Sequence, residues 1–216
     1  MRRDLTSSAL AVLVLTVLLG VVYPLATTGV SQVLWPNKAD GSQVERDGKT
    51  VGSRLIGQDF RKPVLDRAGE PKVDADGNPV LEPDERYFQS RPSATGYSPN
   101  VTYFNNLGPN NAELRDLFAD NLAAYLDLEH PYNPGLARGD VPADAVQTAA
   151  SGVDPHISPD NARIQARRIA YARRVSLDRV LALVDENTDG RGLGVFGEPG
   201  VNVLDLNLAL DEEAQR

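Results

Sequence analysis

The stretch ALAVLVLTVLLGVVY, residues 9–23, is the most informative part of this sequence, because it contains no charged side chain. The uncharged run continues through Trp35. An α-helix needs about 20 mostly apolar residues to cross the hydrocarbon core of a bilayer. Residues 9–28 supply that length, and Tyr23 and Trp35 are aromatic side chains of the kind that collect at a membrane interface. The sequence therefore predicts one transmembrane helix over 9–28, with the lipid bilayer as its surroundings.

A cleaved signal peptide is the alternative interpretation of this end of the chain, because Arg2 and Arg3 would form its positive start. Cleavage sites carry small residues in an A-x-A-like pattern. The best candidate site, after Ala26, has Pro24 at the third position back. We therefore favour an uncleaved anchor.

The charges that flank the apolar run predict its orientation. Arg2 and Arg3 precede the run, whereas Lys38 is the first cation beyond it. Cationic flanks stay in the cytoplasm, so we expect a single-pass protein of the cell (inner) membrane with its C-terminal part outside. The expected division is a cytoplasmic N-terminus over 1–8, the helix over 9–28, a linker and turn region over 29–50, and an extracytoplasmic α+β domain over 51–216.

The charge of the outer part limits its partners. Without Arg2, Arg3 and Asp4, the 22 basic and 30 acidic side chains of the chain become 20 and 29, a net charge of −9. Such a domain repels nucleic-acid phosphates and anionic lipid, which excludes nucleic acid as a partner. The chain has no cysteine, so it forms no disulfide and no thiolate metal site. Its outer part must be stabilised by its own core or by a partner.

The first half of the outer part is predicted to be irregular. Residues 51–60 indicate a strand that enters a glycine-containing turn. Residues 66–86 are rich in Pro, Gly and acidic side chains, which is typical of a long exposed hairpin or loop. Residues 87–100 contain Pro92 and Pro99, which exclude a long helix. No internal repeat is apparent along the chain.

The second half is predicted to be mainly helical. A helix is expected from Asn110, because Glu113 completes a capping-box pattern. Its apolar stripe contains Leu114, Leu117, Phe118, Leu122, Tyr125 and Leu126. A second helix is expected after Ser158 as N-cap, with Pro159 at the first helical position. Ser176 caps a third helix, with Leu177, Val180, Leu181 and Val184 facing inward, and residues 201–213 indicate a short extended entry followed by a helix.

Two motifs in the sequence copy ligand sites incompletely. Residues 192–197 satisfy G-x-G-x-x-G, but a dinucleotide site needs a strand before this motif and a helix after it. Here a helix precedes it and Glu198-Pro199-Gly200 follow, so we predict a loop. Two partial calcium loops also occur, and each lacks a required residue. The first contains Asp185, Asn187 and Asp189 with Phe196 in place of the bidentate acid, and the second contains Asp74, Asp76, Asn78 and Glu85 with Pro79 in place of the turn glycine. No metal site is predicted.

The candidate catalytic groups are explained better as structural residues. The histidines, His130 and His156, are far apart in sequence. Asp154, His156 and Ser158 could suggest a hydrolytic trio, but the Ser158 hydroxyl is better explained as a helix cap. No catalytic residue is predicted. Five arginines, at 163, 167, 168, 173 and 174, make one helix basic. This face is expected to be solvated with local ion pairs, and docking to an acidic partner is the alternative.

The order of six segments resembles the C subunit of the bacterial high-affinity potassium-transporting P-type ATPase, the KdpC family. The segments are YPLATTGVSQVLWP (23–36), GSRLIGQDF (52–60), YFQSRPSATGY (87–97), NLGPNNAELR (106–115), TAASGVDPHISPDNARIQARRIAYAR (148–173) and LVDENTDGRGLGVFGEPGVNVLDLNLAL (183–210). SGVDPHISP is the most specific of these stretches. The chain departs from the family's pattern by an insertion at about 66–86 and by VTYFNNLGP (101–109), where a Ser/Gly-rich segment is expected.

The resemblance implies a non-catalytic, single-pass accessory subunit. Its implied partners are a channel-like potassium-binding subunit and an ATP-hydrolysing subunit, and it is implied to act as a catalytic chaperone that raises the pump's affinity for ATP. The sequence itself shows no cofactor, so ATP is implied by the resemblance alone, and we expect its effect to be indirect. The family-motif residues are Gly57, Gln58, Arg91, Pro92, Ser151, Gly152, Asp154, Pro155, His156, Ser158, Pro159, Gln165, Asn202 and Asn207. The alternative is a stand-alone, membrane-anchored extracytoplasmic protein that binds a cation or small ligand.

Overall fold

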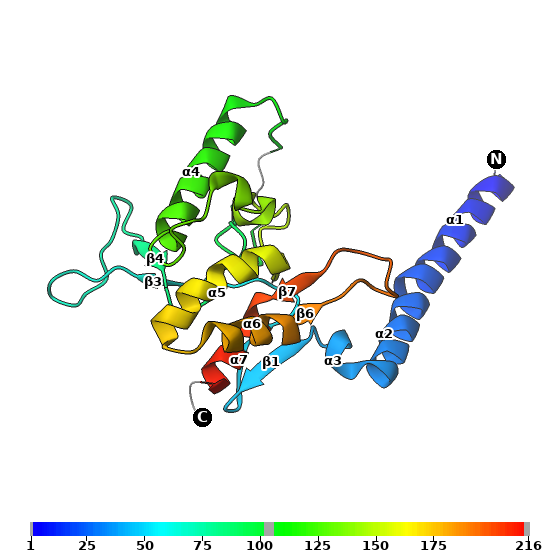
Figure 1. The fold of residues 1–216 in the computed structure, drawn as a ribbon. Coiled ribbons are helices and arrows are strands. Elements are labelled where there is room, and N and C mark those ends of the chain that lie inside the picture. Colours follow the sequence, from blue (N-terminus) through cyan, green and yellow to red (C-terminus); the bar gives the residue numbers. More distant parts are fainter. Residues whose placement is uncertain (1, 102–105, 214–216) are drawn as a thin grey trace. The chain divides into compact units, whose positions relative to one another are not determined.

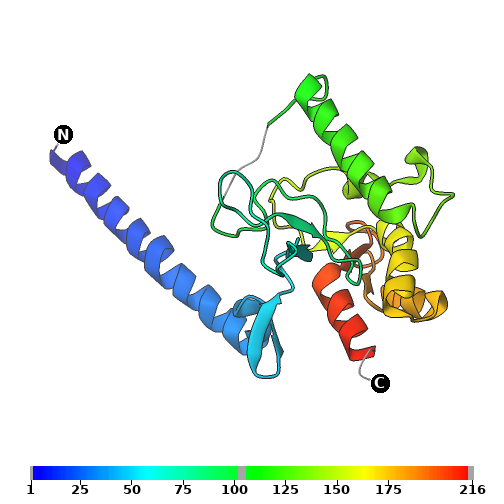
Figure 2. The ribbon, with the colours of Figure 1, turned by 90° about the vertical axis from the view of Figure 1, so that its left-hand side faces the viewer.

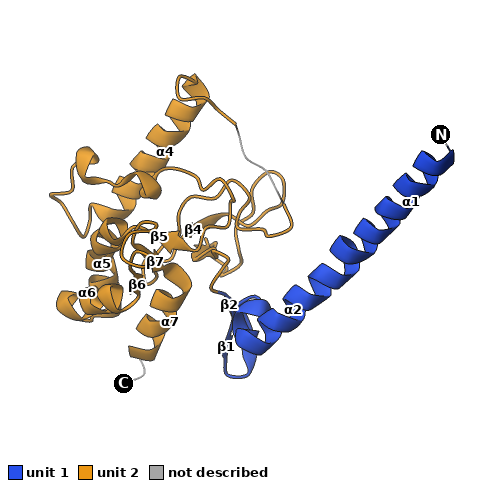
Figure 3. Ribbon diagram, turned by 90° about the vertical axis from the view of Figure 1, so that its right-hand side faces the viewer, with its two compact units in different colours: residues 1–53 blue, residues 54–216 orange. Residues whose placement is uncertain are grey.

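A computed structural model of the chain describes residues 2–101 and 106–213. The chain forms two compact units, residues 1–53 and 54–216 (Figure 3). One long helix dominates the first unit, and the second mixes helices with short strands. The expected α+β class with one N-terminal apolar helix is therefore confirmed. Part of the 101–109 stretch, residues 102–105, lies outside the described residues.

The apolar helix of the first unit is longer than the sequence analysis predicted. It consists of α1 (Arg2–Val17), a π-helical turn (Leu18–Val22) and α2 (Tyr23–Leu34). These 33 residues are long and apolar enough to cross a membrane. At the rise of an α-helix they extend over about 50 Å, which exceeds the hydrocarbon core of about 30 Å. Both ends of the helix therefore have the length to reach the headgroup region.

The π-helical turn has a local cause in Pro24. Proline has no N–H to donate to the carbonyl four residues before it, and its ring crowds that carbonyl. The helix accommodates this with a wider turn, in which the Tyr23 N–H donates to Leu18 O. The Thr27 hydroxyl donates to Tyr23 O at 2.9 Å and lies 3.0 Å from Pro24 O. These bonds satisfy backbone groups that lipid cannot satisfy.

A short helix and a hairpin complete the first unit. Helix α3 (Pro36–Ala39) precedes the antiparallel pair β1 (Gln43–Arg46) and β2 (Lys49–Ser53). Asp47 and Gly48 join the strands with φ of 52° and 72°, the left-handed conformation that tight hairpin turns require. The expected linker region, 29–50, thus contains the end of α2, α3 and most of this hairpin. The strand predicted within 51–60 ends at Ser53, where the chain turns.

Three helices and a small sheet form the core of the second unit (Figures 1 and 2). The helices are α5 (Pro159–Arg173), α6 (Leu177–Glu186) and α7 (Val203–Glu213). The antiparallel sheet has the order β5-β7-β6, with β5 at His156–Ile157, β7 at Gly200–Asn202 and β6 at Thr188–Asp189. The core side chains are Phe88, Ile157, Ala162, Ala166, Ile169, Ala170, Val180, Leu183, Val184, Val201, Val203, Leu206 and Leu210.

The predicted helix starts are confirmed except at α4. The Ser158 hydroxyl accepts from Asn161 N at 3.1 Å, and the Ser176 hydroxyl accepts from Arg179 N at 3.3 Å. Helix α4 (Ala112–Glu129) begins one residue later than predicted, because the Asn111 side chain, rather than that of Asn110, accepts from a first-turn amide. Leu126 of its apolar stripe is buried and the other five residues are half-buried. The N-terminal half of α4 extends beyond the other helices (Figures 1 and 2).

The acid-rich insertion is an exposed hairpin built from two similar turns. Strands β3 (Arg61–Pro63) and β4 (Leu81–Pro83) form its base. Beyond them, LDRAGEP (65–71) and VDADGNP (73–79) fold alike: the carboxylates of Asp66 and Asp74 each accept two backbone N–H groups. The predicted exposed hairpin is confirmed. The expectation of no internal repeat is wrong here, because a seven-residue turn unit is too short to appear as a domain-scale repeat.

A buried ion pair joins α4 to α5. Arg168 and Glu129 both have 0% side-chain exposure, and Arg168 Nε donates to Glu129 Oε1 at 2.9 Å. The prediction of a solvated basic face is therefore wrong at this position, since Arg168 lies on the same buried side of the helix as Asn161 and Gln165. Arg163 is exposed and pairs with Asp160, as predicted. Arg173 departs from the prediction, because its side chain is only 10% exposed and pairs with the distant Asp211. Burial raises the pKa of Glu129, and the guanidinium of Arg168 opposes that shift.

We expect Glu129→Gln to destabilise the domain by about 3–5 kcal/mol, because it leaves the buried Arg168 charge without its counter-ion. The matched control is Glu186→Gln, which breaks an exposed pair with Arg179 and should cost less than about 1 kcal/mol. Urea unfolding of the full chain in detergent, followed by circular dichroism, measures both. Equal losses in the two variants would contradict the argument.

Candidate functional site

Two family-motif residues, Asn207 and Gln165, bind the extended segment around Phe88. This segment pairs with side-chain amides instead of with a strand. Asn207 Oδ1 accepts from Phe88 N at 2.9 Å, and its Nδ2 donates to Phe88 O at 3.0 Å. Gln165 Oε1 accepts from Gln89 N at 2.7 Å, and its Nε2 donates to Gln89 O at 3.2 Å. Because buried backbone groups need partners, these two amides allow an isolated strand to cross the core.

Arg168 lies on the same helix as Gln165 and binds the same extended segment; together with the amides of Asn207 and Gln165 it forms a clamp on that segment. Its Nη1 donates to Glu85 O at 2.7 Å and to Tyr87 O at 3.0 Å, and its Nη2 donates to Gln165 Oε1 at 2.9 Å. The guanidinium therefore binds backbone carbonyls and also orients the amide of Gln165. Its charge is balanced by Glu129, so one ion pair fixes α4, α5 and the extended segment together.

The SGVDPHISP turn lies against the same segment. Asp154 Oδ1 accepts from His156 N at 3.0 Å, and Asp154 Oδ2 accepts from Arg91 Nη1 at 3.2 Å. Gly57 N donates to Val153 O at 2.8 Å on one side of the turn, and Val203 N donates to Pro155 O at 3.0 Å on the other. The turn is thus bonded to three distant parts of the chain, and these bonds make it rigid.

Two glycines permit these close approaches. A Cβ on Gly57 would overlap the carbonyl of Asp154. Gly152 has φ of +70°, and a Cβ there would lie 2.5 Å from Thr95 Oγ1. The Gly152 carbonyl accepts from Ser93 Oγ at 2.6 Å and from Thr95 Oγ1 at 3.2 Å. A side chain at Gly57 would push the turn away from the 52–60 segment, and a side chain at Gly152 would push it away from Thr95.

The hydroxyl of Ser158 is engaged in a capping network. It donates to Asp144 Oδ1 at 2.7 Å while it accepts from Asn161 N. Asp144 Oδ2 accepts from Ser158 N at 2.8 Å and from Asn161 Nδ2 at 3.0 Å. Tyr125 OH donates to Asn161 Oδ1 at 2.9 Å, and burial raises the pKa of this phenol. Because the Ser158 proton goes to Asp144 and not to a histidine, the hydrolytic trio is not formed.

A cleft of about 280 Å³ lies beside the extended segment. Its polar lining includes Asp59, Arg61, Gln89, Ser93, Tyr97 and Tyr125. Arg61 Nη2 donates to Asp59 Oδ2 at 2.7 Å. Burial raises the pKa of Asp59, but the hydrogen bonds and charge of Arg61 outweigh it and lower that pKa overall. Tyr97 OH donates to Arg91 O at 2.6 Å, so the charged and phenolic groups of this cleft already bind within the chain.

The remaining motif residues bind the same framework. Gln58 O accepts from Ser90 Oγ at 2.9 Å, and Pro92 O accepts from Ala149 N at 3.2 Å. Ser151 Oγ accepts from Val153 N at 3.2 Å inside the SGVDPHISP turn. Asn202 Nδ2 donates to Arg54 O at 2.9 Å, and Pro159 occupies the first turn of α5. The ring nitrogens of His156 lie 3.9 Å from the carboxylates of Asp154 and Asp189.

Sequence reasoning missed Asp144, Glu129 and the clamp role of Arg168. One signal was present for Arg168: it follows Asn161 and Gln165 at helical spacing, beside Ala162 and Ile169 on the apolar face. A charge on that face predicts a buried partner. Glu129 continues the apolar stripe of its helix, three residues after Leu126, and Asp144 stands between Ala143 and Ala145. Neither position indicates which distant group the carboxylate binds.

The G-x-G-x-x-G stretch lies in a loop between two strands. The 192–197 loop joins β6 to β7, and Gly192 N donates to Phe196 O at 2.7 Å across a tight turn. The expected loop is confirmed, since the strand β7 follows it where a dinucleotide site needs a helix. Within 2–101 and 106–213, no group of three or more His, Asp or Glu side chains is arranged to hold a metal ion.

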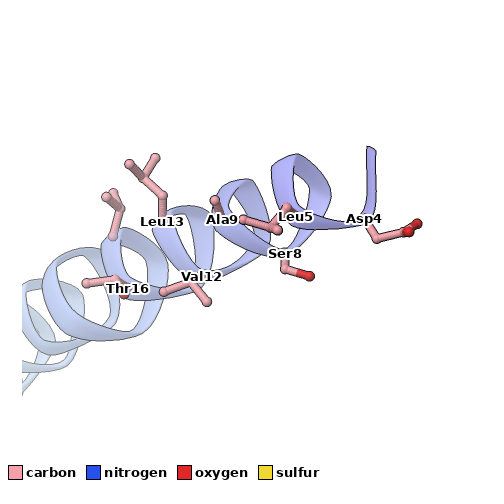
Figure 4. Close-up of a pocket in the computed structure, with 8 residues that line it drawn as sticks. Asp4, Leu5, Ser8, Ala9, Val12, Leu13 and Thr16 are labelled. Carbon is pink, nitrogen blue, oxygen red and sulfur yellow. The ribbon is translucent and has the colours of Figure 1, made fainter. Parts of the chain in front are cut away.

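The membrane helix has a candidate contact face of its own. A shallow groove runs along α1, and Figure 4 shows the side chains that line it. They are Asp4, Leu5, Ser8, Ala9, Val12, Leu13, Thr16 and Val17. Ser8, Ala9 and Thr16 are small, and small residues let two membrane helices approach closely. This face is suited to pack against another membrane helix.

The fold and site define a membrane-anchored protein whose extramembrane domain uses its polar motif residues for internal bonds. The family described as "K+-transporting ATPase, c chain" matches residues 5–212. A potassium-transporting ATPase KdpC subunit from Rhodospirillum rubrum is 45% identical over 98% of this chain and 97% of its own length. The KdpC subunit from Streptomyces avermitilis is 42% identical over 97% of this chain and 94% of its own. The KdpC subunit from Myxococcus xanthus is 47% identical over 90% of this chain and 81% of its own.

The chain therefore belongs to the KdpC family of potassium-transporting ATPase subunits. The membership agrees with the resemblance found in the six sequence segments. It places the chain among subunits of a P-type pump rather than among stand-alone enzymes.

We expect Ser158→Ala to cost about 1 kcal/mol of stability or more, since it removes a helix cap and one bond of Asp144. The matched control is Ser176→Ala, whose cap bond is longer, at 3.3 Å. The control should cost less. Thermal unfolding of both variants tests this, together with ATP turnover per folded complex. Normal turnover supports a structural role, whereas lost turnover at unchanged stability would indicate direct chemistry.

Proposed function

We propose that this chain is a non-catalytic accessory subunit that assembles and stabilises a high-affinity potassium pump. Its partners would be a channel-like potassium-binding subunit and the ATP-hydrolysing subunit. One observation carries the proposal: the motif residues that could do chemistry bind other groups of the chain. Asp154 is paired with Arg91, and the Ser158 proton goes to Asp144. These bonds shape a rigid domain, which is what a subunit interface needs.

The apolar helix supports assembly within the membrane. Residues 2–30 of this helix are exposed, so their apolar side chains are available to a partner. The small side chains of the α1 groove and Gly20 offer close approach to a partner helix. The helix would therefore anchor the subunit and also contact the pump's membrane helices.

We place the larger unit outside the membrane, following Arg2 and Arg3 at the opposite end of the helix. In that orientation the domain does not reach cytoplasmic ATP. The family's implied effect on ATP affinity would then be indirect and would follow from stabilising the assembled pump. A reporter fused to the C-terminus tests the orientation: a periplasm-active reporter should be active and a cytoplasm-active one silent. The reverse result would restore direct contact with ATP.

Gly20→Leu is expected to lower the yield of the pump complex in mild detergent. A Cβ at Gly20 meets nothing within 4 Å in the chain, so the substitution leaves the helix itself intact. Any loss must then come from a partner helix that packs there. Val21→Leu, one position further, adds a single methylene and serves as the matched control.

The measurement is the amount of the two larger subunits that co-purify with the tagged full chain. Equal yields for the two variants would count against packing at Gly20. Purification of the unaltered chain alone would favour the stand-alone binding protein over a pump subunit.

A further inference from the structure

The loop between β6 and β7 carries an exposed apolar tip, made of Leu193, Val195 and Phe196. Leu193 is 93% exposed, and Val195 and Phe196 are each 68% exposed. The loop runs out from the ends of β6 and β7 (Figure 1). Large apolar side chains clustered on a projecting loop do not stabilise the chain that carries them, and they mark contact surfaces.

The tip is held in a defined shape. Gly192 N donates to Phe196 O at 2.7 Å, and Phe196 N donates to Gly192 O at 2.9 Å. Two further backbone bonds, from Gly194 N to Arg191 O and from Val195 N to Gly192 O, close the turn. A preformed turn loses little conformational entropy when it binds, so its side chains are presented ready for contact.

Leu193 stands where the backbone disfavours it. Its φ is +51°, in the left-handed region that costs roughly 1–2 kcal/mol for a residue with a Cβ. Glycine would avoid that cost, and glycines stand on both sides of it in the sequence. The fold alone gives no reason for a leucine here, because the side chain touches solvent. The reason must lie in what the side chain meets outside the chain.

The charges beside the tip favour a protein over a lipid surface as that partner. Segments that bind membrane surfaces carry exposed Lys or Arg that attract anionic headgroups. Here Arg191 is paired with Glu198 at 2.7 Å. Asp189, at the base of the loop, has an 83% exposed carboxylate, and the His156 ring faces it with Nε2 3.9 Å away. The tip is therefore an apolar knob with a negative edge, which an anionic bilayer would repel.

We propose that the 192–197 tip docks into an apolar socket on a partner protein, with at least one cation of the socket's rim facing Asp189. The inference rests on the proposed function, because the partner would be one of the pump's larger subunits. A rigid knob with two or three buried apolar side chains has the form of a binding hot spot. The tip would join the extramembrane domain to the complex, while the apolar helix joins it within the membrane.

Site-specific crosslinking tests this proposal. The chain has no cysteine, so Leu193→Cys in the full chain gives one attachment point for a thiol-linked photocrosslinker. Val73→Cys is the matched control, because Val73 is 60% exposed on the β3–β4 hairpin. The labelled chains are combined with the two larger subunits in nanodiscs and irradiated. A crosslink from position 193 to a larger subunit, absent from position 73, is expected.

An affinity measurement supports the same test. Leu193→Ser with Phe196→Ser should weaken binding of the larger subunits about tenfold or more, as hot-spot truncation does, while Val73→Ser should leave binding unchanged. The backbone bonds of the turn survive these changes, so loss of folding does not explain the result. Crosslinking to lipid, or an assembled complex without a subunit crosslink from position 193, would overturn the proposal. Failure of the unaltered chain to assemble would instead overturn the proposed function.

Discussion

The buried ion pair between Arg168 and Glu129 is the interaction on which the domain depends. It lies at 0% exposure where α4, α5 and the extended 85–89 segment meet. Two charges of opposite sign offset part of the cost of leaving water, and Arg168 offsets more of it by binding Glu85 O and Tyr87 O. A buried pair of this kind adds little net stability. It fixes one arrangement of three elements, because separating them would leave a charge unpaired in the core.

The same requirement for backbone partners explains the amide clamps. Phe88 fills the core with 0% exposure, so its segment must cross the interior. The strands of this unit are only two or three residues long, and none of those in the described residues pairs with it. Asn207 and Gln165 therefore make the backbone hydrogen bonds that a neighbouring strand would make, each with one acceptor and one donor. Side chains used in this way are not available for catalysis, which agrees with the role of a structural subunit.

The two units differ in how they expose their apolar side chains. The helix of the first unit presents a continuous apolar surface with a groove of small residues. The second unit buries its apolar side chains, except for the 192–197 tip and scattered positions. The missing N–H of Pro24 produces the π-helical turn of this helix. The Thr27 hydroxyl donates to the carbonyl of Tyr23 nearby. Under the two proposals above, the apolar helix and the apolar tip would give the subunit two separate points of attachment.

The sequence by itself determined the membrane helix, the helix caps and the family. Length, absence of charge and first-turn hydroxyls are local properties, so Ser158 and Ser176 could be read as caps without coordinates. Segment order identified the family for the same reason. The burial of Arg168 is visible only in the folded structure, because its sequence neighbours suggested a solvated basic face. Its partner Glu129 lies 39 residues away, and no local pattern encodes which distant carboxylate a buried guanidinium meets. Such a pair forms only when packing of the core excludes water from both charged groups, so that each becomes the other's partner.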